Sequence, residues 1–75
     1  MKPLRPEDLR EWRARHGLTQ KTFALFLGVS KGAVEKWEQG ANDIPPMLTM
    51  LTTVLDDSEI GRRLVARSRT EAERN

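Results

Sequence analysis

Three glycines, Gly17, Gly28 and Gly40, each stand directly after a stretch whose apolar residues are spaced as on one face of a helix. Glycine readily adopts the left-handed conformation that ends a helix, so these positions divide the first half of the chain into three short helices. No segment shows the strict alternation of a half-buried strand. With 75 residues and no cysteine, the chain has room for one modest core held by packing alone. The sequence therefore predicts an all-α fold, a compact bundle of about five short helices.

The first three helices have clear start signals. The first is expected over residues 6–16, with Pro6 in its opening turn. Thr19 and Ser30 are placed to cap the second and third helices. The residues expected to face inward are Leu9, Trp12, Arg13 and His16 in the first helix, Phe23, Ala24 and Leu27 in the second, and Val34 and Trp37 in the third. Phe26 lies outside this inner face and is expected either at the core rim or at a partner surface.

Two further helices are expected after a proline-containing loop over residues 41–46. The fourth should run to about Leu55, and its apolar face comprises Met47, Leu48, Leu51, Val54 and Leu55. Ser58 can cap the fifth, which carries Ile60, Leu64 and Val65. From Arg67 onward the chain is polar, and we expect it to fray.

Several classes of protein are disfavoured by the composition. The longest uncharged apolar stretch, residues 23–29, is too short to cross a bilayer, and the first six residues lack the apolar core of a signal peptide, so we expect a cytoplasmic protein with no membrane partner. His16 has no thiol near it to complete a metal site, and no cofactor is expected. No nucleophile, base and pocket assemble, so an enzyme is not expected. Residues 1–40 hold eight basic and five acidic side chains, which places the positive excess in the first half.

Residues 18–40 carry the most specific pattern. Two short helices joined by a brief turn with glycine cross steeply, which leaves the second helix standing out from the surface. An exposed helix of that width fits the major groove of B-DNA. Ala24 is small where the two helices approach each other, and Val29 and Val34 are expected to pack beneath the turn.

This segment resembles the XRE family of Cro-like and phage-repressor-like helix-turn-helix proteins, over residues 6–55. The matching elements are Leu18-Thr19-Gln20, Phe23-Ala24, Leu27-Gly28-Val29-Ser30, Val34, Trp37-Glu38-Gln39-Gly40 and Ile44-Pro45-Pro46, with Leu9 and Arg13 before them. The resemblance implies a lambda-repressor-like domain over residues 1–57, with residues 58–75 as a C-terminal helix and frayed tail. It also implies a sequence-specific DNA-binding regulator, expected to be a repressor, that inserts residues 30–38 into the major groove.

The resemblance assigns roles to individual residues. Base edges are expected to face Ser30, Lys31, Gly32, Glu35 and Lys36, although Lys31 also suits a solvated surface and Glu35 suits an intrahelical ion pair. DNA phosphates are expected to contact Thr19, Gln20 and Lys21 at the start of the second helix, and Gln39, Gly40, Ala41 and Asn42 at the end of the third. Arg13 and Glu38 take the positions of a buried structural ion pair. Gly32 has no side chain with which to read a base.

The expected partners are double-stranded DNA and a second copy of the chain. A homodimer would double the DNA contacts, and its surface is expected over residues 51–64. The alternative is an antitoxin-like interaction module that binds a protein partner through residues 56–75 and also represses its own promoter.

Overall fold

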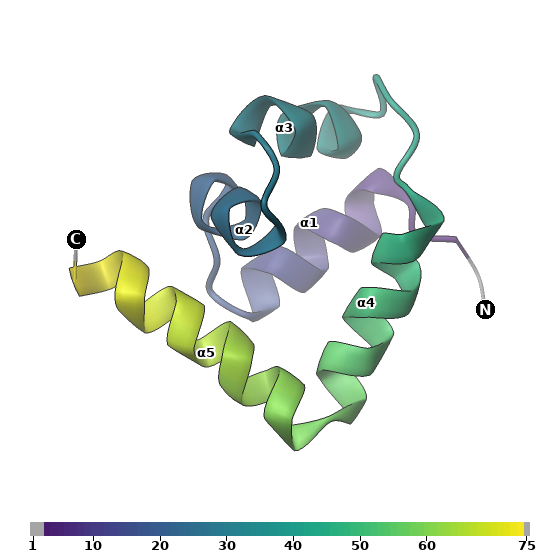
Figure 1. Cartoon of the computed structure of the whole chain (residues 1–75). Coiled ribbons are helices and arrows are strands. Elements are labelled where there is room, and N and C mark those ends of the chain that lie inside the picture. Colours follow the sequence, from purple (N-terminus) through teal and green to yellow (C-terminus); the bar gives the residue numbers. More distant parts are fainter. Residues whose placement is uncertain (1–2, 75) are drawn as a thin grey trace.

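The computed structural model describes residues 3–74, with side chains as far as Thr70. Five helices follow one another along the chain: α1 (Pro6–Arg15), α2 (Gln20–Leu27), α3 (Lys31–Gln39), α4 (Pro46–Asp57) and α5 (Glu59–Arg74). The described residues contain no strand. The all-α prediction is therefore confirmed (Figure 1).

The ends of α2 and α3 form as the sequence predicts. Thr19 Oγ1 accepts the amide N–H of Thr22 at 3.0 Å, and Ser30 Oγ accepts that of Ala33 at 3.1 Å. Each side chain thus satisfies a backbone donor that has no partner within its helix. The glycine that ends α3, Gly40, has φ +77°, a left-handed conformation that costs glycine little and other residues more.

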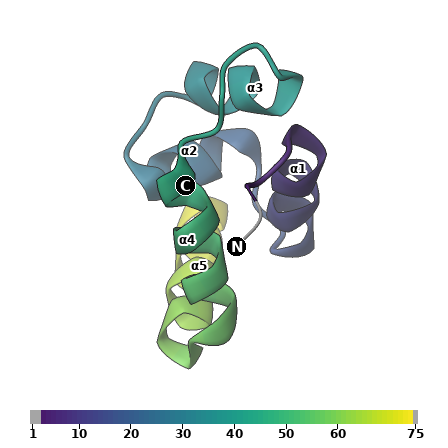
Figure 2. The ribbon, with the colours of Figure 1, turned by 90° about the vertical axis from the view of Figure 1, so that its right-hand side faces the viewer.

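The core lies where α1, α2 and α3 meet the inner sides of α4 and α5. Its buried residues are Leu9, Trp12, Leu18, Phe23, Ala24, Val34, Trp37, Leu48, Leu55 and Val65. Phe26 is half-buried and packs against this cluster, which settles its position at the core rim. Figures 1 and 2 show α3 at one end of the molecule, while the connection between α4 and α5 forms the opposite end. The core therefore supports α3 from one side and leaves its other side free.

The inner face of α4 differs from the prediction. Leu48 and Leu55 are buried as expected, but Met47 is 74% exposed and Val54 54% exposed. Leu51 is partly buried against the core, as predicted, and two threonines, Thr49 and Thr52, are also buried. Thr52 Oγ1 donates to the Leu48 carbonyl at 2.9 Å, and Thr49 Oγ1 accepts the amide N–H of Leu4 at 3.2 Å. Because these hydroxyls are hydrogen-bonded, their burial costs little, and the apolar side chains of Met47 and Val54 can remain exposed.

The C-terminal helix is longer than predicted, because α5 continues to Arg74 instead of fraying from Arg67. Val65 is 2% exposed and belongs to the same buried cluster as the first three helices. Further along α5, Arg69 lies over the turn between α1 and α2: a Cβ added at Gly17 would lie 3.1 Å from Arg69 Cδ. The aliphatic stem of an arginine can pack in this way while its charged end stays in water. These two contacts anchor a segment whose composition alone indicated a loose tail.

Candidate nucleic-acid interface

The turn between α2 and α3 consists of three residues. Gly28 has φ +76°, and the amide N–H of Val29 donates to the Ala24 carbonyl at 3.0 Å, which closes the end of α2. Ala24 is 2% exposed where the helices meet, as expected. Val29, by contrast, is 36% exposed, so the expectation that it packs beneath the turn is wrong. The angle between the helices depends instead on Val34, which is fully buried.

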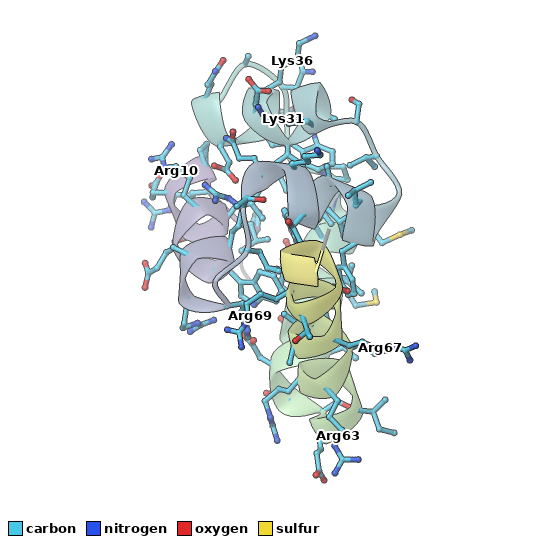
Figure 3. The ribbon with its side chains drawn as sticks, turned by 90° about the vertical axis from the view of Figure 1, so that its left-hand side faces the viewer. Arg10, Lys31, Lys36, Arg63, Arg67 and Arg69 are labelled. Atoms are coloured by element: carbon cyan, nitrogen blue, oxygen red, sulfur yellow. The ribbon has the colours of Figure 1, made fainter. Side chains whose placement is uncertain are left out.

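One side of α3 is buried and the other is free. Val34, Trp37 and Glu38 face the other helices, whereas Lys31 and Lys36 are exposed. Figure 3 shows both lysines at the end of the molecule farthest from the connection between α4 and α5. The short helix α3 therefore presents two positive side chains to the outside on a firmly packed base.

Predicted base-contacting residues occupy the free side of α3. Ser30 and Gly32 are exposed and Glu35 is half-buried. The carboxylate of Glu35 lies 3.9 Å from Lys31 Nζ, so these two residues, one helical turn apart, form an ion pair. Both side chains are 40% exposed or more, so this pair contributes little to stability and can open when another partner competes.

Glu38 joins the first three helices. Its carboxylate, which is 3% exposed, accepts two hydrogen bonds from Arg13, from Nε at 2.8 Å and from Nη2 at 2.9 Å. Arg13 Nη1 also donates to the Leu18 carbonyl at 2.9 Å. The two residues that the resemblance pairs thus form a two-pronged ion pair with its remaining polar atoms largely satisfied, which is the arrangement that makes burial of charge tolerable.

The three residues predicted to contact phosphate at the start of α2 differ in what their side chains bind. Gln20 Nε2 donates to Glu38 Oε1 at 3.2 Å, so its side chain is held in place beside α3. The hydroxyl of Thr19 is used locally, since it accepts from the Thr22 amide and donates to the Thr22 hydroxyl at 2.9 Å. Lys21 is exposed. Gln20 and Lys21 therefore remain the better placed side chains for an anion at this helix end.

The other predicted phosphate contact lies at the end of α3. The amide N–H groups of Gly40, Ala41 and Asn42 all donate to carbonyls of α3, at 3.2, 2.9 and 3.4 Å. These groups close the helix and leave no free backbone donor among the three residues. A phosphate near this end of α3 must therefore be held by side chains, of which Gln39 and Asn42 are exposed.

Sequence reasoning missed two residues that organise this half of the molecule. Arg10 Nη1 donates to the main-chain carbonyl of Glu38, and the Asp56 carboxylate accepts from Trp12 Nε1 at 3.0 Å. His16, expected on the inner face of the first helix, is the C-cap residue of α1, and its Nε2 lies 3.0 Å from Asp56 Oδ1. The spacing of Arg10, three residues before Arg13, was a signal that both arginines face α3. Nothing local in the sequence marks Asp56.

Other kinds of site were also sought. Among the described residues no group of three or more His, Cys, Asp or Glu side chains is arranged to hold a metal ion. Within the same part of the chain, no helix combines the length and apolar character needed to span a membrane.

Comparison with known proteins gives one clear result. The helix-turn-helix family matches residues 9–54, which includes α2, the turn, α3 and most of α4. No curated protein and no solved structure matches the chain. The matched segment covers more than half of the 75 residues and contains the capped, steeply joined pair of helices described above. The chain therefore belongs to the XRE family of helix-turn-helix DNA-binding regulators.

Proposed function

We propose that this protein is a sequence-specific transcriptional repressor that acts in the cytoplasm by inserting α3 into the major groove of double-stranded DNA. The observation that carries the proposal is the two-sided character of α3: its inner residues Val34, Trp37 and Glu38 are buried, while Lys31 and Lys36 remain exposed. An α-helix with a free polar face fits the major groove, where each base pair presents a distinct pattern of donors and acceptors. We infer repression because occupation of a promoter is the simplest way in which this DNA-binding segment can act.

Base reading is assigned to the first two turns of α3. Lys31 can donate to guanine O6 and N7, and Glu35 can accept from a cytosine amino group after their mutual ion pair at 3.9 Å opens. Lys36, one turn further along, reaches the same groove or its edge. Ser30 and Gly32 lie at the start of the helix, where the absence of a side chain at Gly32 lets the backbone approach a base pair closely.

Phosphate contacts are assigned to both ends of the helix pair. Gln20, whose side chain is hydrogen-bonded to Glu38, and Lys21 contact phosphates of the strand that passes the start of α2. The side chains of Gln39 and Asn42 contact phosphates of the strand at the far end of α3. Phosphate contacts position the protein without reading sequence, so their loss weakens binding to every duplex.

The proposal is tested by selecting bound duplexes from a random DNA pool and then comparing two variants. Lys31→Ala should change the ranking of selected sites, whereas Gln20→Ala should weaken binding to all of them by about the same factor. Repression is tested separately by placing the selected site within a promoter that drives a reporter. Recovery of no preferred sequence, or an unchanged ranking with Lys31→Ala, would contradict the assignment of α3 as the reading helix.

A homodimer is the assembly that we propose on the DNA. α4 exposes Met47, Met50 and Val54 at helical spacing, and α5 exposes Ile60 and Leu64 one turn apart. Several exposed apolar side chains on neighbouring helices are typical of a surface that binds a partner. A symmetric pair would place two copies of α3 on half-sites about one helical turn apart. Selected sequences should then show two-fold symmetry.

The exposed pair Ile60 and Leu64 also suits a second candidate, an antitoxin-like role in which residues 56–75 bind a protein partner. This alternative uses the same apolar residues, so the oligomeric state separates the two. A protein that remains monomeric on its selected DNA would favour the partner role, and one that binds two half-sites cooperatively would favour the homodimer.

A further inference from the structure

Arg10 is an exposed residue of α1 whose side chain reaches the end of α3. Its Nη1 donates to the main-chain carbonyl of Glu38, in the last turn of α3. A guanidinium has five N–H donors, so one bond to a carbonyl leaves most of them free. Arg10 therefore has donors to spare at the edge of the proposed DNA-binding face.

Arg10 also keeps its charge uncompensated, unlike several other arginines. Four other arginines are paired with carboxylates: Arg5 with Glu7, Arg13 with Glu38, Arg15 with Asp56 and Arg63 with Glu59. None of the ion pairs among the described side chains includes Arg10. In Figure 3 Arg10 lies beside α3, toward the end of the molecule that carries Lys31 and Lys36, whereas Arg63 lies at the opposite end.

Glu38 is hydrogen-bonded to both Arg10 and Gln20. Arg10 donates to its main-chain carbonyl, and Gln20 Nε2 donates to its carboxylate at 3.2 Å. That carboxylate is paired with Arg13, so it does not cancel the charge of Arg10. The unpaired cation and a side chain expected to hold a phosphate thus share one residue of α3 as a partner.

A phosphate can be held at the end of α3 only if a cation is present there. A helix C-terminus carries partial negative charge, and the amide groups of residues 40–42 donate to α3 itself, so the backbone at this end offers no attraction to an anion. An arginine fork matches the geometry of a phosphate, and its bond to the Glu38 carbonyl holds it in place before DNA arrives. We propose that Arg10 is a phosphate-binding residue, which contacts the DNA strand that passes the end of α3. This inference rests on the proposed DNA-binding function.

The salt dependence of binding tests the inference. Arg10→Ala should weaken binding to the selected duplex and to an unrelated duplex by the same factor. It should also reduce the slope of log K against log salt concentration by about 0.9, the value of one phosphate contact. Arg67→Ala is the control, since it removes the same charge from an exposed position of α5 outside the proposed dimer surface and away from α3, and it should leave the slope unchanged.

Two further variants separate a phosphate contact from a structural role at the Glu38 carbonyl. Arg10→Lys keeps a charge and a donor and should retain most of the slope. Arg10→Gln keeps a donor without the charge, so it should melt close to the wild-type temperature and still lose about 0.9 of the slope. If Arg10→Ala does not fold, Arg10→Gln carries the test.

A scan with single uncharged methylphosphonates along the selected duplex locates the contact. One position should weaken binding of the wild-type protein and have no effect on binding of Arg10→Ala. An unchanged salt slope in both Arg10→Ala and Arg10→Gln, with wild-type binding intact, would overturn the role of Arg10 alone. Wild-type protein that binds no duplex would overturn the proposed function together with it.

Discussion

The indole N–H of Trp12 donates to Oδ1 of Asp56 at 3.0 Å, which joins α1 to the last turn of α4 across 44 residues of sequence. The same carboxylate lies 3.0 Å from His16 Nε2 and 3.0 Å from Arg15 Nη2. One side chain thus holds three residues at the end of α1. In a chain without cysteine, such a cluster fixes the position of α4 against α1.

Removal of this carboxylate should loosen the attachment of α4. Asp56→Ala leaves the half-buried polar groups of α1 without their acceptor, and we expect the free energy of unfolding to fall by about 1–3 kcal/mol. Urea denaturation followed by circular dichroism measures it. Asp57→Ala, at the exposed neighbouring position, should change stability by less than about 0.5 kcal/mol. Equal losses in the two variants would contradict the role of Asp56.

The pair Arg13 and Glu38 should behave as a buried ion pair. Glu38→Ala leaves Arg13, whose side chain is 19% exposed, without its carboxylate, and we expect a loss of about 3 kcal/mol in the free energy of unfolding. The double variant Arg13→Met with Glu38→Leu should recover much of that loss, because an apolar pair carries no uncompensated charge. Denaturation of all three proteins measures the difference. A double variant no more stable than the single one would argue against the ion pair as the origin of the effect.

The first turn of α5, which packs against α4, should tolerate no side chain at Gly61. A Cβ there would lie 2.7 Å from Leu55 Cα and 2.9 Å from the Leu55 carbonyl oxygen, both backbone atoms that cannot move without shifting the helices. We expect Gly61→Ala to lower the free energy of unfolding by about 1–3 kcal/mol. Gly32→Ala is the control within a helix, since a Cβ there meets nothing closer than 3.9 Å, and it should raise stability by up to about 1 kcal/mol.

Gly32→Ala should separate stability from DNA binding. If the backbone at the start of α3 approaches a base pair closely, a methyl group at Gly32 obstructs the contact while the fold becomes more stable. We expect weaker binding to the selected duplex and little change with unrelated DNA, measured by fluorescence anisotropy. Unchanged preference for the selected duplex would mean that Gly32 stays away from the bases.

A charge placed within the proposed dimer surface should weaken the dimer. Ile60→Glu places a carboxylate at a position that is 70% exposed, so the stability of the monomer should change by less than about 0.5 kcal/mol. A dimer that buries Ile60 should dissociate, and binding to a duplex with two half-sites should weaken more than binding to a single half-site. Analytical ultracentrifugation measures the first effect. Leu25→Glu, equally exposed on α2, is the control and should leave the dimer intact.

Local signals in the sequence were sufficient for the helices and for the turn between α2 and α3. Thr19 and Ser30 cap their helices, and Gly28 and Gly40 end them, because each of these roles depends on the residue and its close neighbours in the chain. The position of α3 on the surface followed from the same signals. The resemblance to the XRE family then assigned roles to its outward residues.

The sequence pattern was misleading where burial depends on distant contacts. In α4 it favoured Met47 and Val54 as core residues, but the tertiary structure buries Thr49 and Thr52 in their place. Hydropathy orients a helix only if the buried face must be its most apolar one, and threonines whose hydroxyls bond to a backbone relax that requirement. The same limit applies to the segment after Arg67, which is helical because α5 packs against the core.

The sequence by itself determined which segments are helical, where the early helices begin and end, and which family the chain resembles, since these depend on residues within one or two turns of each other. Only the tertiary structure decided which side of α4 is buried, how far α5 extends, and that Arg10 and Asp56 reach other helices. Those outcomes depend on which side chains from remote parts of the chain compete for the same space and the same hydrogen bonds, and no local pattern records that competition.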